Sequence, residues 1–138
     1  LHSDGRDHDC LYVDGGPSST GTTGHVQMQG QEIFKKAVTR LAEVAKEALN
    51  ANDLTGADLD WLVPHQANLR IMRGTTKKLG MAEDKLIVTI DRHANTSAAS
   101  IPLAISDAHG AGKFSQGDLI LLEGIGGGLT WGACLLRW

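Results

Sequence analysis

The stretch 61-WLVPHQAN-68 gives the first indication of the fold. Its apolar run, Trp61 to Val63, stops at a proline, and a histidine, a glutamine and an asparagine come soon after. A short apolar run that ends at a breaker predicts a buried strand. The residues that follow predict a helix over 68–79 that ends at Gly80. His65 therefore stands at a strand terminus just before a helix, which makes it a candidate functional side chain.

The rest of the chain alternates between helical and extended patterns. Apolar residues repeat at helical spacing from Ile33 to Leu49, and Thr55-x-x-Asp58 resembles a capping box. We expect residues 1–30 to be irregular apart from the apolar triplet 11–13. Beyond the 68–79 helix, the pattern predicts a strand at 86–90, a helix over 97–108, and a hairpin of strands 119–122 and 129–136 joined by glycines.

Alternating helices and strands predict an α/β layered fold with a mixed, mostly parallel sheet and an antiparallel edge. In such folds, ligands bind beyond the carboxyl ends of the strands. Three unusual segments fall at predicted strand ends: PHQAN at 64–68, DRHANTSAAS at 91–100 and GIGGG at 124–128. We therefore expect these segments to meet at one rim of the sheet and to form a site.

Composition narrows the class of protein. The 138 residues, 41% hydrophobic and 21% charged, fit one folded domain. A net charge of −3 provides no overall attraction to nucleic acid or anionic membranes, and no apolar run approaches the ~18 residues that span a bilayer. The first ten residues do not resemble a signal peptide, and two cysteines make no disulfide framework, so we expect a reducing cytoplasm. Because the chain begins at Leu1 rather than methionine, we expect a processed chain or a piece of a longer one.

The three segments offer hydrogen-bond donors rather than strong acids or bases. The positive end of the helix that begins near Asn68 favours a neutral His65 ring. Asn95 offers an amide that donates but does not titrate, and Gly126, Gly127 and Gly128 leave backbone N–H groups accessible. Such donors suit a reaction that develops negative charge on oxygen, as in an enolate or a tetrahedral thioester adduct.

Each of these residues also has a purely structural interpretation, and the sequence leaves it open. A lone histidine at a strand end can be structural, Asn95 can simply cap the following helix, and the glycines can form only a tight turn. No nucleophile is evident, because Cys10 lies in a polar segment and Cys134 within a predicted strand. Ser97 and Ser100 lack the G-x-S-x-G context of a nucleophilic serine.

Two charged groups need an interpretation. The amino-terminal residues include metal-ligand types, but without the paired spacing of a metal site we interpret them as solvated loop charge and expect no bound metal; they are His2, Asp4, Asp7, His8, Asp9 and Cys10.

A basic face is more distinctive, since the 68–79 helix carries cations and no acidic residue. It suits an acidic partner or a phosphate-bearing ligand, although a solvated face is the alternative; its members are Arg70, Arg73, Lys77 and Lys78, with Lys35, Lys36 and Arg40 as a second row.

At this point the residues identify a family. WLVPHQANLRIM at 61–72, DRHANTSAASIPLA at 91–104 and GGGLTWGACLLRW at 126–138 resemble the carboxyl-terminal half of β-ketoacyl-acyl-carrier-protein synthase III, and so does MQGQEIFKKAV at 28–38. The resemblance implies a thiolase-like fold in which two α/β halves form a five-layered αβαβα sandwich and work as a homodimer. It implies that residues 1–138 are the carboxyl-terminal catalytic half, and that the nucleophilic cysteine lies in an amino-terminal half.

The resemblance also implies roles for residues. His65 and Asn95 match the histidine and asparagine of a Cys-His-Asn triad, which hydrogen-bond the malonyl thioester and stabilise the enolate formed on decarboxylation. Gly127 matches an oxyanion-hole amide. Acetyl-CoA and malonyl-acyl carrier protein would be the substrates, without a further cofactor. The remaining matches are a pantetheine channel of Gly30, Phe34, Ala67 and Asn68, and a surface for docking the carrier protein made of Lys35, Arg70, Arg73, Lys77 and Lys78.

The sequence differs from the family pattern in two respects, and two alternative functions remain open. Ile125 stands where the family commonly has an aromatic residue, and without a nucleophile this chain alone should not catalyse condensation. It should also expose an apolar surface that fits the other half. The first rival is a related Cys-His-Asn synthase that uses another acyl starter, such as a polyketide or quinolone enzyme. The second is a non-enzymatic module that binds carrier protein or CoA through its basic face.

Overall fold

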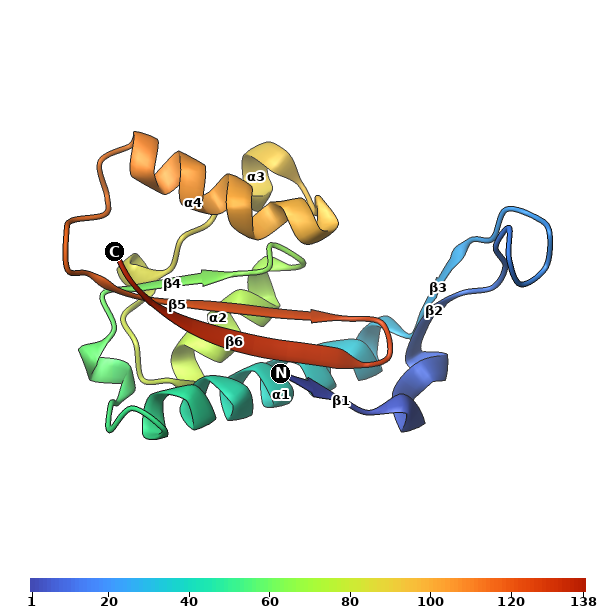
Figure 1. The fold of residues 1–138 in the computed structure, drawn as a ribbon, viewed down its shortest axis with the longest axis horizontal. Coiled ribbons are helices and arrows are strands. Elements are labelled where there is room, and N and C mark those ends of the chain that lie inside the picture. Colours follow the sequence, from blue (N-terminus) through green and yellow to red (C-terminus); the bar gives the residue numbers. More distant parts are fainter.

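A computed structural model describes residues 1–138 as three layers, with a four-stranded sheet between two layers of helices (Figure 1). The sheet order is β1-β6-β5-β4. The strands are β1 (His2–Ser3), β4 (Trp61–Pro64), β5 (Leu119–Gly126) and β6 (Thr130–Arg137). The β5–β6 hairpin and the strand at 61–63 are confirmed, although β5 continues through the first glycines and the turn is shorter than predicted.

The prediction of a mostly parallel sheet is wrong for this chain. Only β4 and β5 pair in parallel, whereas β5–β6 and β1–β6 are antiparallel. The segment 86–90, predicted as a strand, makes only an isolated parallel bridge between Leu62 and Leu86. Beyond that bridge the side-chain amide of Gln66 bonds to Ile87 and Thr89, so a side chain replaces the backbone ladder that a strand would have made.

Two of the three predicted helices, the one that contains Ile33 to Leu49 and the one at 68–79, are confirmed with closely similar bounds. They are α1 (Gly30–Asn50), α2 (Leu69–Lys78), α3 (Ile90–His93) and α4 (Ser100–Gly110). The Asn68 side chain caps α2 by accepting from the Arg70 backbone N–H at 2.9 Å. The helix predicted over 97–108 is divided into a 3-10 turn, Ser97–Ala99, and α4. Thr55 and Asp58 form the predicted capping box of the short turn Gly56–Asp58.

Residues 1–30 are more regular than predicted. Besides β1 and a 3-10 turn at Gly5–Cys10, β2 (Leu11–Val13) pairs with β3 (Val26–Met28) in a hairpin that projects from the body of the molecule (Figure 1). Strands of three residues carry too little alternation to be read from a sequence. The hairpin leaves apolar side chains in solvent, since Val13, Val26 and Met28 are 54%, 69% and 61% exposed.

The core lies on both faces of the sheet. The face toward α1 and α2 buries Leu59, Leu62, Met72 and Leu121, and the face toward α4 buries Val63, Ile87, Ala104, Ala108 and Ile120. Because side chains alternate along a strand, β4 and β5 bury apolar side chains on both faces of the sheet. None of the helices combines the length and the apolar character that crossing a membrane requires.

Candidate active site

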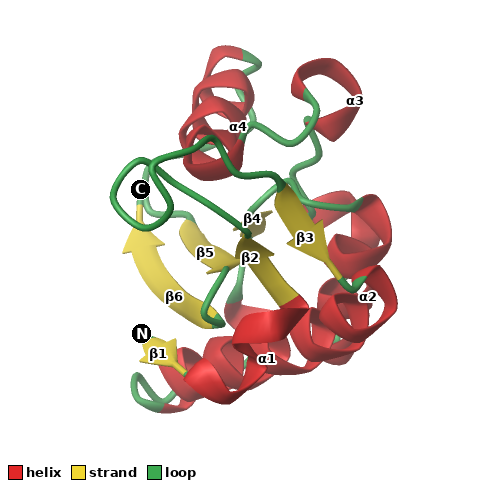
Figure 2. Cartoon of the chain, turned by 90° about the vertical axis from the view of Figure 1, so that its right-hand side faces the viewer, coloured by secondary structure: helices red, strands yellow, loops and turns green.

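A large cavity lies where the ends of β4 and β5 meet the start of α1, the start of α2 and the β2–β3 hairpin. Figure 2 shows the hairpin in front of this region, between α3 and α4 on one side and α1 and α2 on the other. The cavity has a volume of about 1180 Å³. Its lining includes nine of the residues predicted to act: Gly30, Phe34, Lys35, His65, Ala67, Asn68, Arg70, Asn95 and Gly127. The prediction that the three segments meet at one rim is therefore confirmed.

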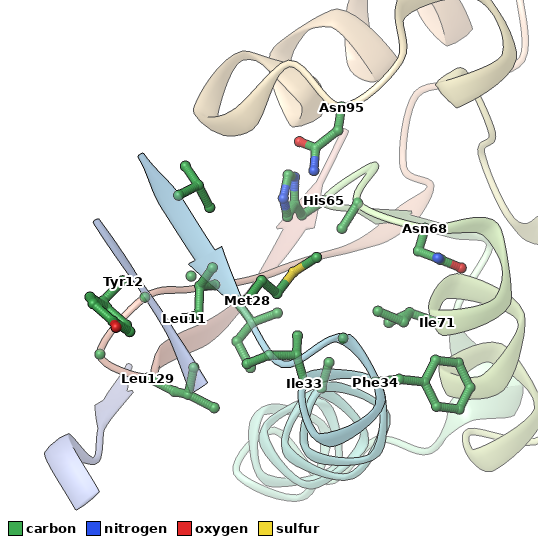
Figure 3. Close-up of a pocket in the computed structure, with 18 of the residues that line it drawn as sticks. Leu11, Tyr12, Met28, Ile33, Phe34, His65, Asn68, Ile71, Asn95 and Leu129 are labelled. Atoms are coloured by element: carbon green, nitrogen blue, oxygen red, sulfur yellow. The ribbon is translucent and has the colours of Figure 1, made fainter. Parts of the chain in front are cut away.

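His65 is held at the carboxyl end of β4 by its backbone and by its ring. Its N–H donates to the carbonyl of Glu123 on β5 at 2.7 Å, and its ring Nδ1 lies 2.6 Å from the Ser100 hydroxyl. The other ring nitrogen, Nε2, bonds to no group of the chain, while the ring lines the cavity (Figure 3). Burial lowers the pKa of His65 below its ordinary value, which favours the neutral ring.

Asn95 both caps a turn and faces the cavity, so its two interpretations are compatible. Its Oδ1 accepts a hydrogen bond from the Ser97 backbone N–H at 3.0 Å. The amide nitrogen makes no bond within the chain and points toward the His65 ring in Figure 3. The flanking residues Ala94 and Ser97 have φ of 55° and 56°, a region that favours glycine. Strained backbone therefore brackets the asparagine, as is common at functional sites.

The glycine run forms the turn of the β5–β6 hairpin beside the cavity, as the structural interpretation proposed. Gly128 has φ of 132°, and a Cβ there would lie 2.8 Å from the Thr130 hydroxyl. A Cβ on Gly127 would lie 3.2 Å from the carbonyl oxygen of Leu11 at the base of the hairpin. Both positions therefore favour glycine for local reasons, and their backbone stays close to the open space of the cavity.

Gln66 supports the site and was not identified from the sequence. Its side chain is fully buried and its polar atoms are satisfied: Nε2 donates to the carbonyls of Pro64 and Ile87, and Oε1 accepts from the Thr89 N–H at 2.8 Å. It thereby ties the segment with His65 to the segment that leads to Asn95. The only signal in the sequence is its place two residues after the apolar strand β4, next to His65.

Glu123 was also missed, and its environment is unusual. The residue is 1% exposed, and neither carboxylate oxygen has a hydrogen-bond partner. Burial raises its pKa to about 8, so the carboxyl is neutral at neutral pH. It stands on β5 directly beside the backbone of His65, on the opposite face of the sheet from the ring.

Part of the predicted basic face is neutralised by acidic neighbours. Lys35 pairs with Glu32 at 3.0 Å, and Arg73 pairs with Glu83 at 2.5 Å. The second row does not form a free basic surface either, since Lys36 pairs with Asp7 and Arg40 with Asp4 and Glu43. These partners come from other elements or other turns, so the absence of acidic residues within 68–79 overstated the charge of this face.

Three exposed cations remain unpaired on α2. Arg70 lies over the Phe34 ring, 5.9 Å from its centroid, at the edge of the cavity. Lys77 makes no polar contact, and Lys78 donates only to the Thr39 hydroxyl at 3.3 Å. The positive surface thus runs along α2 from the cavity edge toward its carboxyl end.

The remaining predictions concern nucleophiles and metals. Cys10 is half-buried, Cys134 is exposed and neither lines the cavity. The structure brings together no group of three or more His, Cys, Asp or Glu side chains suited to a metal ion. The amino-terminal polar residues have partners instead: Asp4 forms an ion pair with Arg6, Asp7 forms one with Lys36, and His2 is hydrogen-bonded to Glu47.

Known proteins resemble this chain in both sequence and fold. The sequence model of the family described as 3-oxoacyl-acyl-carrier-protein (ACP) synthase III C terminal matches residues 49–138. The beta-ketoacyl-acyl-carrier-protein synthase III of Paramagnetospirillum magneticum is 62% identical over 137 residues, which cover 99% of this chain and 42% of that protein.

Solved structures agree with this relationship. The 3-oxoacyl-acyl-carrier-protein synthase III of Aquifex aeolicus is 39% identical with a TM-score of 0.91, and that of Pseudomonas aeruginosa is 35% identical with a TM-score of 0.91. Each match covers 99% of this chain and 42% of the other. The predicted α/β, thiolase-like fold class is therefore confirmed, and the chain spans less than half the length of the relatives it matches.

Proposed function

Because this chain belongs to the 3-oxoacyl-acyl-carrier-protein synthase III C-terminal family, we propose that it is the carboxyl-terminal catalytic half of a β-ketoacyl-acyl-carrier-protein synthase III. The complete enzyme condenses acetyl-CoA with malonyl-acyl carrier protein and starts fatty acid synthesis in the cytoplasm, with no cofactor beyond these substrates. The activity belongs to the complete enzyme, because neither cysteine of this chain lines the cavity.

The observation that carries the proposal is the pair of free donors at the cavity. His65 Nε2 and the Asn95 amide nitrogen face the same space, while the other polar atom of each side chain is engaged by Ser100 or by the Ser97 backbone. Two neutral donors stabilise an oxygen that gains negative charge, and they do so more strongly in a partly buried site than in water.

Decarboxylation of a malonyl thioester creates such an oxygen. The carbon–carbon bond to the carboxylate breaks, carbon dioxide leaves, and the electron pair delocalises onto the thioester oxygen as an enolate. We assign His65 and Asn95 as the donors to that oxygen. The enolate carbon then attacks the carbonyl carbon of the acetyl group carried by the cysteine of the amino-terminal half, and the Gly127 N–H stabilises the oxyanion of the tetrahedral adduct. When that adduct collapses, the carbon–sulfur bond to the cysteine breaks, the thiolate leaves and the β-ketoacyl product stays on the carrier protein. Each donor is worth about 100- to 1000-fold in rate.

The cavity walls and the charged surface suit the carrier of the substrate. Gly30, Phe34, Ala67 and Asn68 form the part of the wall that a pantetheine arm would follow. The unpaired cations of α2 suit an acidic carrier protein, with Arg70 at the cavity mouth. Two further partners belong to the proposal: the amino-terminal half, which would cover the exposed apolar hairpin, and a second copy in a homodimer.

A chimera tests this function. The chain would replace the matching part of the Paramagnetospirillum magneticum synthase, to which it is 62% identical, and carbon dioxide release from malonyl-acyl carrier protein would be measured. We expect release from the chimera, and a loss of about 100- to 1000-fold in His65→Ala and in Asn95→Ala. The matched control is His25→Ala, an exposed histidine of the hairpin loop.

The outcome decides between activity and binding alone. A folded chimera that binds carrier protein but releases no carbon dioxide would leave only a binding module. Equal release by the parent chimera and His65→Ala would remove His65 from the reaction.

A further inference from the structure

A buried hydroxyl lies against the ring of His65. Ser100 is the first residue of α4 and is only 1% exposed. Its Oγ lies 2.6 Å from the His65 Nδ1, and it accepts the backbone N–H of Gln66 at 3.2 Å. The contact joins the end of β4 to the start of α4 and uses the ring nitrogen that does not serve the cavity.

The protons at this contact can be assigned by counting donors and acceptors. A serine hydroxyl has one proton and two acceptor lone pairs. The Gln66 N–H can only donate, so it occupies one lone pair of Ser100 Oγ. If His65 Nδ1 also carried a proton, Oγ would accept twice, and the hydroxyl proton would be buried with no acceptor in the chain. If Nδ1 is bare, the hydroxyl donates to it and every group is satisfied, which is the arrangement that buried polar groups adopt.

We propose that Ser100 is a positioning residue that holds the neutral His65 ring in the tautomer with its proton on Nε2. That nitrogen can then only donate to a group in the cavity. The catalytic meaning of this tautomer rests on the proposed function, whereas the tautomer itself does not. The lowered pKa of His65, caused by burial, keeps the ring in the neutral form in which a tautomer must be chosen.

The same short segment orients both donors. Asn95 lies five positions before Ser100, and the Ser97 backbone N–H between them occupies the Asn95 Oδ1. The asparagine is thereby turned so that its NH₂ group faces the cavity, while Ser100 turns the histidine so that its Nε2–H does. The segment 95–100 thus supplies one of the two donors and the contacts that orient both.

The contact could also be interpreted as a serine nucleophile beside its base, but burial excludes this. With 1% exposure, the Ser100 hydroxyl has no access to a ligand in the cavity, and it is absent from the cavity wall that His65 lines. No carboxylate bonds to His65 either, so the third member of a hydrolytic triad is missing. Ser100 therefore acts through His65.

The tautomer can be observed directly. Long-range ¹H–¹⁵N spectra of the histidine-labelled chain report which ring nitrogen carries the proton, and His65→Gln identifies the His65 signals. We expect the parent chain to show the proton on Nε2, with Nδ1 shifted as a hydrogen-bond acceptor. Ser100→Ala should remove that shift and populate the Nδ1–H form, and Ser100→Thr should restore the parent spectrum. The matched control is Ser106→Ala, an exposed serine of the same helix.

The parent spectrum decides the matter even if Ser100→Ala fails to fold, because a proton on Nδ1 would overturn the proposal. Identical His65 signals in the parent and in folded Ser100→Ala would also overturn it.

A kinetic measurement on the chimera adds the catalytic consequence. Ser100→Ala should lower kcat for carbon dioxide release by about 10- to 100-fold and change KM little. Losses of this size are typical when a residue that orients a functional histidine is removed. A fixed tautomer without any release would leave the Ser100 inference intact and refute the proposed function. Release that is insensitive to Ser100→Ala, together with an unchanged tautomer, would refute the Ser100 inference and leave the function intact.

Discussion

Glu123→Gln should change how the stability of the fold depends on pH. The Glu123 carboxyl is buried without a hydrogen-bond partner, and its pKa is about 8 in the folded chain against an ordinary 4.5. Between these values the folded chain keeps a proton that the unfolded chain releases. The stability from this group is therefore complete below pH 4.5 and is lost as pH rises through about 8.

The size of the effect follows from the same two values. Each pH unit between them removes about 1.4 kcal/mol, so the whole interval corresponds to about 5 kcal/mol. This is a large part of the stability of a domain of this size. Glutamine fills nearly the same space and cannot ionise. The variant should therefore lack this slope and gain on the parent chain by about 3 kcal/mol between pH 5 and 7.

Urea unfolding followed by circular dichroism, at pH values from about 5 to about 8, measures both slopes. Glu43→Gln is the matched control, since Glu43 is an exposed glutamate of α1, and its pH dependence should follow the parent chain. Parallel curves for Glu123→Gln and the parent chain would refute the reasoning. They would mean that the folded carboxyl ionises at an ordinary pH and has a charged or hydrogen-bonding partner.

Three further variants test the packing, the strain and the charge around the cavity. Gln66→Leu should lower the free energy of unfolding by about 3 kcal/mol in urea titrations, because it removes a buried amide that satisfies three backbone groups; a loss below about 1 kcal/mol would contradict this. Ala94→Gly should raise that free energy by about 1 kcal/mol, because its φ of 55° is strained for alanine; lower stability would disprove the strain. In the chimera, Arg70→Glu should weaken carrier-protein binding about tenfold at low salt and less at high salt, whereas Lys46→Glu, in the second half of α1, should not. Equal losses would point to net charge rather than a docking surface.

The sequence predicted the elements whose patterns are long or sharply ended. α1 follows from the amphipathic periodicity between Ile33 and Leu49, and the β5–β6 hairpin follows from two apolar runs around glycines. The β2–β3 hairpin was missed because its strands are only three residues long and are separated by a long loop. The segment 86–90 has the buried apolar residues of a strand, but only its Ile87 N–H bonds to β4, while the Gln66 side chain bonds to the Ile87 carbonyl and the Thr89 N–H.

The sequence predicted the cavity residues whose placement depends only on their position at the end of a predicted strand. The expectation that polar residues at strand ends converge brought His65 and Asn95 to one cavity, and this holds even though the second strand is reduced to one bridge. Gln66, Ser100 and Glu123 were not found, because their roles depend on which group lies opposite each of them. A buried amide with three partners and a buried carboxyl with none look alike in a sequence.

The segment that carries Asn95 combines strained backbone with a fixed position, and polar contacts of the residues before it explain how the position is kept. Ala94 and Ser97 have positive φ, which an isolated loop would relax. Arg92 and His93 both contact the Asp107 carboxylate, at 2.9 and 2.8 Å, and so tie α3 to α4. The first residue of α4 in turn contacts the His65 ring. Asn95 and His65 are thus linked through one connected set of contacts, from α3 through α4 to β4, and we expect Asp107 to affect the geometry of a cavity that it does not line.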